Sequence, residues 1–141
     1  SPMSRGLGDV YKRQDMFKGK VEVLYNQINL SLTHLDHMFD GTLEYMQAND
    51  ILPMAYSPLG SYFKEDDCKI KDVVDKLKNK YGCTDYQLLI SWLLRHPSKV
   101  YPVIGTTKSD RIKSSLESLK IEIDLIDWFE LLEASVGKRV P

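Results

Sequence analysis

The chain has 141 residues, of which 43% are hydrophobic and 28% are charged, and its formal net charge at pH 7 is -1. This composition is typical of an ordinary globular protein and excludes the disordered and fibrous classes. A nearly neutral chain has no general electrostatic attraction to nucleic acid or to an acidic membrane surface, so we expect neither partner. Any anion site must come from a local cluster of residues.

The cysteines and the hydropathy pattern predict a cytoplasmic protein. Cys68 and Cys83 form no Cys-x-x-Cys pair and have no histidine at zinc-finger spacing, which favours free thiols in a reducing compartment. His34 and His37 lack the further ligands that a metal site needs. The sequence contains no apolar run of about 18 residues and no signal-peptide pattern, so we expect no membrane segment.

Residues 1–14 show neither helical nor strand periodicity. The run GLGDVYKRQ resembles translated sequencing-adapter scars, so we expect residues 1–14 to be a non-native segment and residues 15–141 to form the domain. On this expectation the true gene extends upstream of Asp15 with a different sequence.

The first predicted unit is strand, helix, strand. The run VEVLYNQINLSL alternates with a period of two, which places Leu24, Ile28 and Leu30 on one face and Gln27 on the other. Asp40 is then a predicted cap for a short helix. A short buried strand, LPMAYS, follows.

Two helices are predicted next. One contains an apolar stripe that includes Val74 and Leu77 and ends at Gly82, a usual left-handed terminator. The other starts with the capping box Thr84–Gln87 and ends at His96-Pro97.

The last predicted unit begins with a third apolar strand, YPVIG. Ser109 is the predicted cap of the following helix, in which Ile112, Leu116 and Leu119 line one side. A closing helix is capped by Asp124 and ends at Gly137.

Strands separated by helices indicate parallel strands with right-handed crossovers, and short apolar strands indicate burial on both faces. The fold class is therefore α/β. A complete (β/α)8 barrel takes roughly 250 residues, so three strands supply less than half of one. A small doubly wound sheet is the alternative.

One segment has the chemistry of a phosphate site. Residues 105–111 (GTTKSDR) join the third strand to a helix N-terminus and offer backbone amides, two threonine hydroxyls and the cations of Lys108 and Arg111. The alternative is that both cations are only solvated and the hydroxyls only cap the helix. The Gly-rich dinucleotide fingerprint is absent, which argues against a Rossmann site.

Four stretches, in order, resemble aldo-keto reductases: NQINLSLTHLD, DGTLEYMQANDILPMAYSPLG, LLISWLLRHPSKVYPVIGTTKSDRIK and DWFELLEASVGKRVP. They are similar to strands 6 to 8 and the closing helices of that family's (β/α)8 TIM barrel, and the resemblance covers residues 20–141. The final run is similar to the bacterial YdhF-like branch of predicted oxidoreductases. The resemblance implies that the chain is the C-terminal portion of the barrel.

The resemblance also implies contacts with the cofactor NADP(H). Gln27 would contact the nicotinamide carboxamide and Tyr56 would stack on the nicotinamide ring. Ser57 and Leu59 would meet the pyrophosphate. The alternative is that Gln27 and Tyr56 are ordinary core residues.

The adenosine end of the cofactor is implied to lie near the last predicted strand. Thr107 and Arg111 match the family's positions for the 2′-phosphate, with Lys108 assisting, and an arginine fork favours NADP over NAD. Ser114 and Ser115 stand where many members carry a carboxylate and an amide that contact adenine.

The family's catalytic tetrad of Asp, Tyr, Lys and His is not found in this sequence. Asp75 and Tyr81-Gly82 resemble part of it, but their spacing is one residue too long and they lie on a predicted surface helix. We therefore expect no catalytic residues here and a chain that is inactive by itself.

The resemblance implies a function for the intact parent, which would reduce small aldehydes or ketones to alcohols with NADPH. One alternative is a cofactor-sensing binding or regulatory module. Another is a truncated, non-functional product that self-associates through unpaired barrel edges.

Overall fold

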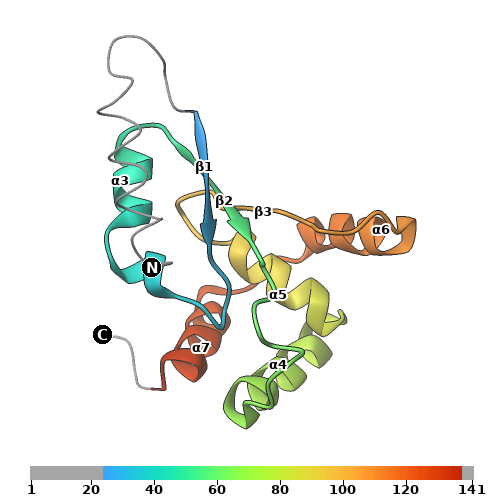
Figure 1. Ribbon diagram of the computed structural model, residues 1–141. Coiled ribbons are helices and arrows are strands. Elements are labelled where there is room, and N and C mark those ends of the chain that lie inside the picture. Colours follow the sequence, from blue (N-terminus) through green and yellow to red (C-terminus); the bar gives the residue numbers. More distant parts are fainter. Residues whose placement is uncertain (1–23, 138–141) are drawn as a thin grey trace.

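The computed structural model describes residues 24–137 (Figure 1). The predicted non-native segment, residues 1–14, lies outside this range. The elements in chain order are β1 (Tyr25–Asn29), α2 (Asp36–Phe39), α3 (Thr42–Ala48), β2 (Leu52–Tyr56), α4 (Cys68–Tyr81), α5 (Asp85–Leu94), β3 (Tyr101–Pro102), α6 (Ser109–Glu117), the 3-10 helix η1 (Ser118–Lys120) and α7 (Leu125–Val136).

The three strands form a parallel sheet in the order β1-β2-β3, which confirms the predicted α/β class. Asn29 pairs with Tyr56, and Ala55 pairs with Pro102. Strand β3 is shorter than the predicted YPVIG, since its pairing with β2 ends at Pro102. One further hydrogen bond, from the Val103 N–H to the Ala55 carbonyl (2.8 Å), continues the contact beyond β3.

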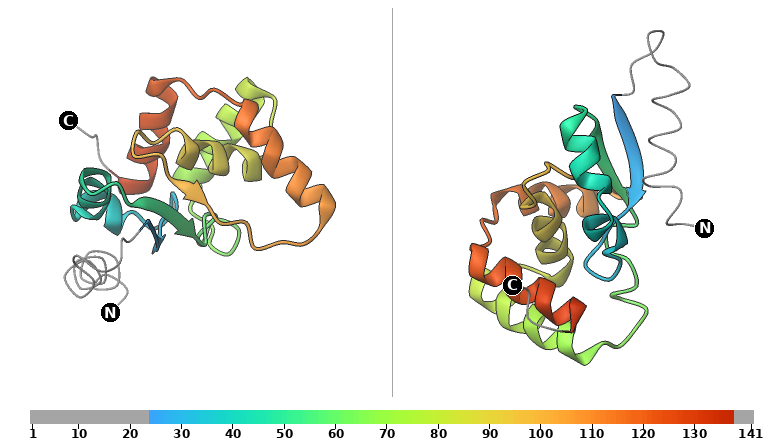
Figure 2. Two further views of the ribbon diagram at one scale, coloured as in Figure 1. Left: turned by 90° about the horizontal axis from the view of Figure 1, so that it is seen from above. Right: turned by 90° about the vertical axis from the view of Figure 1, so that its left-hand side faces the viewer.

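The two faces of the sheet have different surroundings. Helices α4, α5 and α7 lie on one side (Figure 2), and Ile28 and Ala55 are buried there. On the other side, which we name the open sheet face, Tyr25, Leu52 and Tyr101 are exposed. Parallel strands covered by helices on one face are the arrangement expected for part of a barrel wall.

Helix α5 forms the centre of the core. Every residue from Gln87 to Leu93 is buried, so this helix has no polar face of the usual kind. Trp92 and Trp128 stack with 5.0 Å between ring centroids. The indole N–H of Trp92 donates to the backbone carbonyl of Trp128 (3.1 Å), and the indole N–H of Trp128 donates to the backbone carbonyl of Trp92 (2.8 Å). This reciprocal pair joins α5 to α7 without leaving either indole N–H unsatisfied.

The predicted helix signals between α4 and α5 are confirmed. Gly82 ends α4 with a φ of 63°. In the capping box, the Gln87 N–H donates to the Thr84 hydroxyl (3.2 Å), and the Gln87 side chain accepts from the Thr84 N–H (3.1 Å). Both signals depend on residues that are close together in the chain, so the sequence alone predicts them.

Two predicted caps are wrong in detail. Ser109 is the first residue of α6, and Lys108 occupies the cap position without a side-chain cap hydrogen bond. Gly41 caps α3, with a φ of 89°; Asp40 lies one residue earlier and accepts from the Thr42 N–H (2.9 Å). Each observed cap thus lies one residue from the predicted cap.

Two predicted faces also need correction. The period of two predicts that Leu24 shares the buried face of β1, but Leu24 is exposed. The predicted apolar stripe after β3 is exposed as well: Ile112 by 41% and Leu116 by 59% in α6, and Leu119 by 64% in η1. Among the described residues of α6, only Ser115 is buried. The position of α6 therefore depends on contacts other than apolar packing.

Candidate functional site

A cleft of about 230 Å³ opens where the chain leaves β2 and β3. It is lined by three segments: Ser57, Pro58, Leu59 and Gly60 after β2; Val103, Ile104, Gly105 and Thr106 after β3; and Tyr86 and Arg111 on α5 and α6. Sites in parallel α/β folds lie at this carboxyl edge of the sheet. The cleft thus brings together three of the predicted residues, Ser57, Leu59 and Arg111.

The wall after β2 is a tight turn. Ser57 has a φ of 50° and Gly60 a φ of 55°, and the Gly60 N–H donates to the Ser57 carbonyl (2.9 Å). A Cβ on residue 60 would lie 2.0 Å from Thr33 Oγ1 and 2.4 Å from Ser31 Oγ, so only glycine fits. The Ser61 N–H also donates to Thr33 Oγ1 (2.9 Å). The loop after β1 therefore supports the loop that forms the cleft wall.

The opposite wall leads into the N-terminus of α6. No side chain caps this helix, so the backbone amides of its first turn keep their capacity to meet an anion. The Lys108 N–H donates to the Thr106 hydroxyl (3.2 Å), which shapes the loop entering the helix. Arg111 lines the cleft in the first turn of α6. Amide donors, a helix dipole and a guanidinium are together a donor set that fits a phosphate group.

The other predicted cofactor residues do not line this cleft. Thr107 and Lys108 are exposed in the loop just before α6. Gln27 lies two residues after the exposed Tyr25, and Tyr56 lies four residues after the exposed Leu52, which pairs with Tyr25. Because strand side chains alternate, Gln27 and Tyr56 both lie on the open sheet face. Gln27 is exposed and Tyr56 is half-buried. The predicted residues thus form two groups, one on the sheet face and one around the cleft, joined by the adjacent pair Tyr56-Ser57.

The structure adds Tyr86 to the site, a residue that the sequence patterns did not predict. Tyr86 is half-buried in the first turn of α5 and lines the cleft. Its position two residues after Thr84, the cap of α5, was an available signal. Helix α5 leads into β3 and so runs back from the carboxyl edge of the sheet, which places its first turn beside any site there.

One histidine of the segment after β1, His37, has a structural role. His37 is buried, and its Nδ1 lies 2.9 Å from Asp40 Oδ2. Burial by itself raises the pKa of the Asp40 carboxyl, but hydrogen bonds from Thr42 and His37 outweigh burial and hold the pKa below its usual value. This cluster stabilises the turn between α2 and α3.

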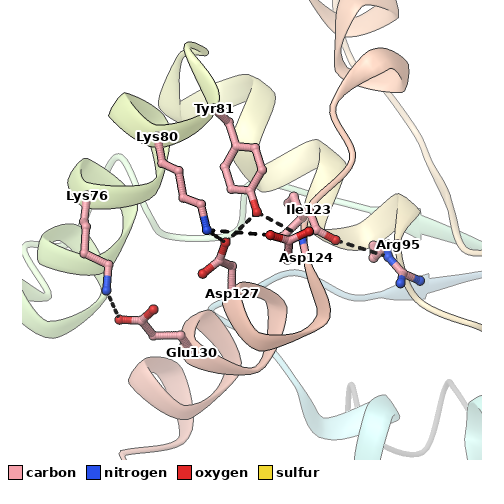
Figure 3. A network of polar contacts seen from close by, with 8 residues as sticks. All are labelled: Lys76, Lys80, Tyr81, Arg95, Ile123, Asp124, Asp127 and Glu130. Carbon is pink, nitrogen blue, oxygen red and sulfur yellow. Dashed lines mark hydrogen bonds and ion pairs between the residues drawn. The ribbon is translucent and has the colours of Figure 1, made fainter.

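Tyr81, which resembles a catalytic tyrosine, joins α4 to α7 (Figure 3). Its hydroxyl donates to Asp127 Oδ2 (2.5 Å) and accepts from the Asp124 N–H (2.9 Å), while Lys80 donates to the same Asp127 oxygen (2.7 Å). Burial and the bond to Asp127 raise the pKa of Tyr81, whereas a general acid works best with a pKa near the ambient pH. Asp75 pairs with Lys78 instead. Neither Tyr81 nor Asp75 lines the cleft.

Other features of residues 24–137 add nothing to this site. A cavity of about 600 Å³ lies at the C-terminal end of α5, where Ser91 and Arg95 line it, and holds none of the predicted residues. In the same range no three His, Cys, Asp or Glu side chains meet in a way that could hold a metal ion. No described helix combines the length and apolar character needed to cross a bilayer.

The chain is similar in sequence to known reductases. The pattern of the Aldo/keto reductase family matches residues 8–135. The 6-dehydroglucose reductase of Agrobacterium fabrum is 37% identical over 117 residues, which are 82% of this chain and 39% of that protein. Oxidoreductase YdhF of Escherichia coli is 31% identical over 123 residues, 82% of this chain and 40% of that protein. The predicted resemblance to the family and to YdhF is confirmed.

Solved structures of the same family share the fold. The thermostable aldo-keto reductase Tm1743 matches with a TM-score of 0.75 at 22% identity, over 86% of this chain and 43% of that one. An aldo-keto reductase from Klebsiella pneumoniae in complex with NADPH matches with a TM-score of 0.66 at 25% identity, over 76% of this chain and 37% of that one. The chain spans about two fifths of the length of the Agrobacterium fabrum and Escherichia coli relatives. From residue 8 to residue 135, this chain belongs to the aldo/keto reductase family.

Proposed function

We propose that this chain supplies the C-terminal part of the cofactor site of an NADPH-dependent aldo-keto reductase. The observation that carries the proposal is the cleft, where Ser57, Leu59 and Arg111 converge beside the uncapped N-terminus of α6. The Klebsiella pneumoniae relative in complex with NADPH supports the choice of cofactor. The intact reductase would convert small aldehydes or ketones to alcohols.

The residues around the cleft divide the work of holding NADP(H). Arg111, with Thr107 and Lys108 in the adjoining loop, would bind the 2′-phosphate, since a guanidinium fork suits a dianion. The turn at Ser57 and Leu59 would hold the pyrophosphate. On the open sheet face, Gln27 would hold the carboxamide and Tyr56 would form a flat platform for the ring. When bound, NADPH supplies the hydride that reduces the carbonyl carbon.

The proton that completes the reduction would come from outside this chain. Among residues 24–137, the tyrosines whose pKa is shifted, Tyr62 and Tyr81, have raised values, with burial as the main cause in each. Raised values disfavour proton transfer near neutral pH. Neither tyrosine lines the cleft, and the family's catalytic tetrad is not found in this sequence, so we expect the chain alone to bind cofactor fragments without reducing carbonyl compounds.

Calorimetric titration of the 141-residue chain tests the proposal. Adenosine 2′,5′-bisphosphate should bind at least about tenfold more tightly than 5′-AMP, a difference typical of one charge-assisted contact. Arg111→Ala should remove most of that preference. Lys113→Ala is the matched control, since Lys113 is an exposed cation of the same helix that does not line the cleft. Equal binding of both nucleotides, or NADPH-dependent carbonyl reduction by the chain alone, would contradict the proposal.

Two further proposals concern location and boundaries. Both cysteines are free, which is in keeping with a reducing cytoplasm. We retain residues 15–141 as the reductase domain and residues 1–14 as a non-native segment, although the family match begins at residue 8. The genomic sequence upstream of Asp15 tests that boundary.

A further inference from the structure

Helix α6, which carries Arg111, is joined to α5 by a chain of hydroxyl hydrogen bonds. The Tyr86 and Ser115 hydroxyl oxygens lie 2.5 Å apart, and Ser115 Oγ donates to the Arg111 carbonyl (2.7 Å). A serine hydroxyl has one proton. Because Ser115 donates that proton to Arg111, the hydroxyl of Tyr86 must donate to Ser115. The bonds therefore run in one direction, from Tyr86 through Ser115 to the backbone of Arg111.

A second contact from the same turn of α5 reinforces this attachment. The Gln87 side-chain amide donates to the Ser114 carbonyl (3.2 Å) and to Glu117 Oε2 (3.2 Å). The apolar stripe of α6 is exposed among the described residues, and Ser115 is the one buried residue of that helix. Helix α6 is therefore held in place by hydrogen bonds from Tyr86 and Gln87, whereas α5 and α7 are held by apolar packing.

We propose that Tyr86 is a positioning residue for the 2′-phosphate: through Ser115 it fixes the turn of α6 that presents Arg111 to the cleft, and it thereby sets the preference for 2′-phosphorylated nucleotides. This inference rests on the proposed function. A guanidinium fork binds a phosphate well only over a narrow range of geometry, so a small shift of its backbone weakens that contact selectively.

The same geometry removes Ser115 from direct contact with adenine. Its hydroxyl is buried and both of its bonds are made inside the protein, one to Tyr86 and one to Arg111. Tyr86, and not Ser115, lines the cleft. Tyr86 accordingly contributes a wall as well as a hydrogen bond, and Phe at this position would keep the wall and lose only the bond.

The test compares Tyr86→Phe with a matched control, Tyr62→Phe. The Tyr62 hydroxyl also bonds the first turn of α5, at Asp85 Oδ2 (3.4 Å), but makes no bond to α6. The ratio of the two dissociation constants, for adenosine 2′,5′-bisphosphate and for 5′-AMP, is measured on the 141-residue chain by calorimetry. Tyr86→Phe should lower the preference about fivefold, the effect of one hydrogen bond, with 5′-AMP binding changed less than about twofold. Tyr62→Phe should leave the ratio unchanged.

Two additional variants test whether Tyr86 acts through Ser115 and Arg111. Ser115→Ala removes the same connection from the other side and should lower the ratio as Tyr86→Phe does, which also serves if Tyr86→Phe fails to fold. In the Arg111→Ala background, Tyr86→Phe should have no further effect on the ratio, because the residue that it positions is gone.

The outcomes separate this inference from the proposed function. If Tyr86→Phe weakens both nucleotides equally, or matches Tyr62→Phe, Tyr86 is merely structural and the inference fails while the cofactor site stands. If the wild-type chain does not distinguish the two nucleotides, the proposed function fails and the inference fails with it.

Discussion

Replacing Gly60 with alanine perturbs the cleft wall at its tightest point. The left-handed backbone (φ of 55°) costs an alanine about 1–2 kcal/mol. The new Cβ would also lie 2.0 Å from Thr33 Oγ1, so the loop after β1 must move and the bond from the Ser61 N–H to Thr33 is lost. Overpacking adds about 1–3 kcal/mol and the lost bond about 1 kcal/mol. We expect Gly60→Ala to lower the free energy of unfolding by about 3–6 kcal/mol.

Gly82→Ala is the matched control. Gly82 has a similar φ of 63°, but a Cβ there would meet nothing within 4 Å, so the left-handed penalty of about 1–2 kcal/mol stands alone. Urea unfolding followed by circular dichroism measures both variants, and nucleotide titration should show weaker binding for Gly60→Ala only. Adding Thr33→Ala to Gly60→Ala should recover part of the loss. Equal destabilisation by the two glycine replacements would refute the steric reasoning.

Three more predictions concern stability and association. Tyr81→Phe removes the hydroxyl that donates to the Asp127 carboxylate and should cost about 1–2 kcal/mol in urea unfolding; exposed Tyr25→Phe should cost under about 0.5 kcal/mol, and similar losses would contradict this role. The pKa values of Asp127 and Asp40 are lowered, so their stabilisation is present above the unfolded pKa of about 3.9 and is lost as pH falls through the lower folded values. Asp127→Asn should therefore reduce the loss in the free energy of unfolding as pH falls below about 4. An unchanged pH dependence in this variant would contradict the role of Asp127. The open sheet face predicts concentration-dependent association in light scattering, which a monodisperse monomer with cooperative unfolding would exclude.

Burial and hydrogen bonds together shift the pKa values of Asp127 and Tyr81. Burial raises the pKa of the Asp127 carboxyl, but hydrogen bonds from Lys80 and Tyr81 outweigh burial and lower it. The same bond to Asp127 helps to raise the pKa of Tyr81. Tyr, Lys and Asp side chains that meet in this way hold two helices together, so residue types alone do not identify a catalytic group.

The predicted site residues differ in how far the structure supports them. Ser57, Leu59 and Arg111, implied by the family resemblance, meet around one cleft although they come from separate segments. Gln27 and Tyr56 lie on the open sheet face, and their contact with a nicotinamide remains a prediction. Tyr86 was missed because its contribution depends on Ser115, which is 29 residues away in the sequence.

The sequence by itself determined the features that short-range chemistry controls. The end of α4 at Gly82 and the capping box of α5 follow from patterns within a few residues. The α/β class and the parallel strands follow from the order of strands and helices along the chain. The tertiary structure alone decided the length of β3, the exposed stripe of α6 and the direction of the bonds from Tyr86 to Arg111. Those features depend on which distant segments lie side by side, and local periodicity carries no information about such neighbours.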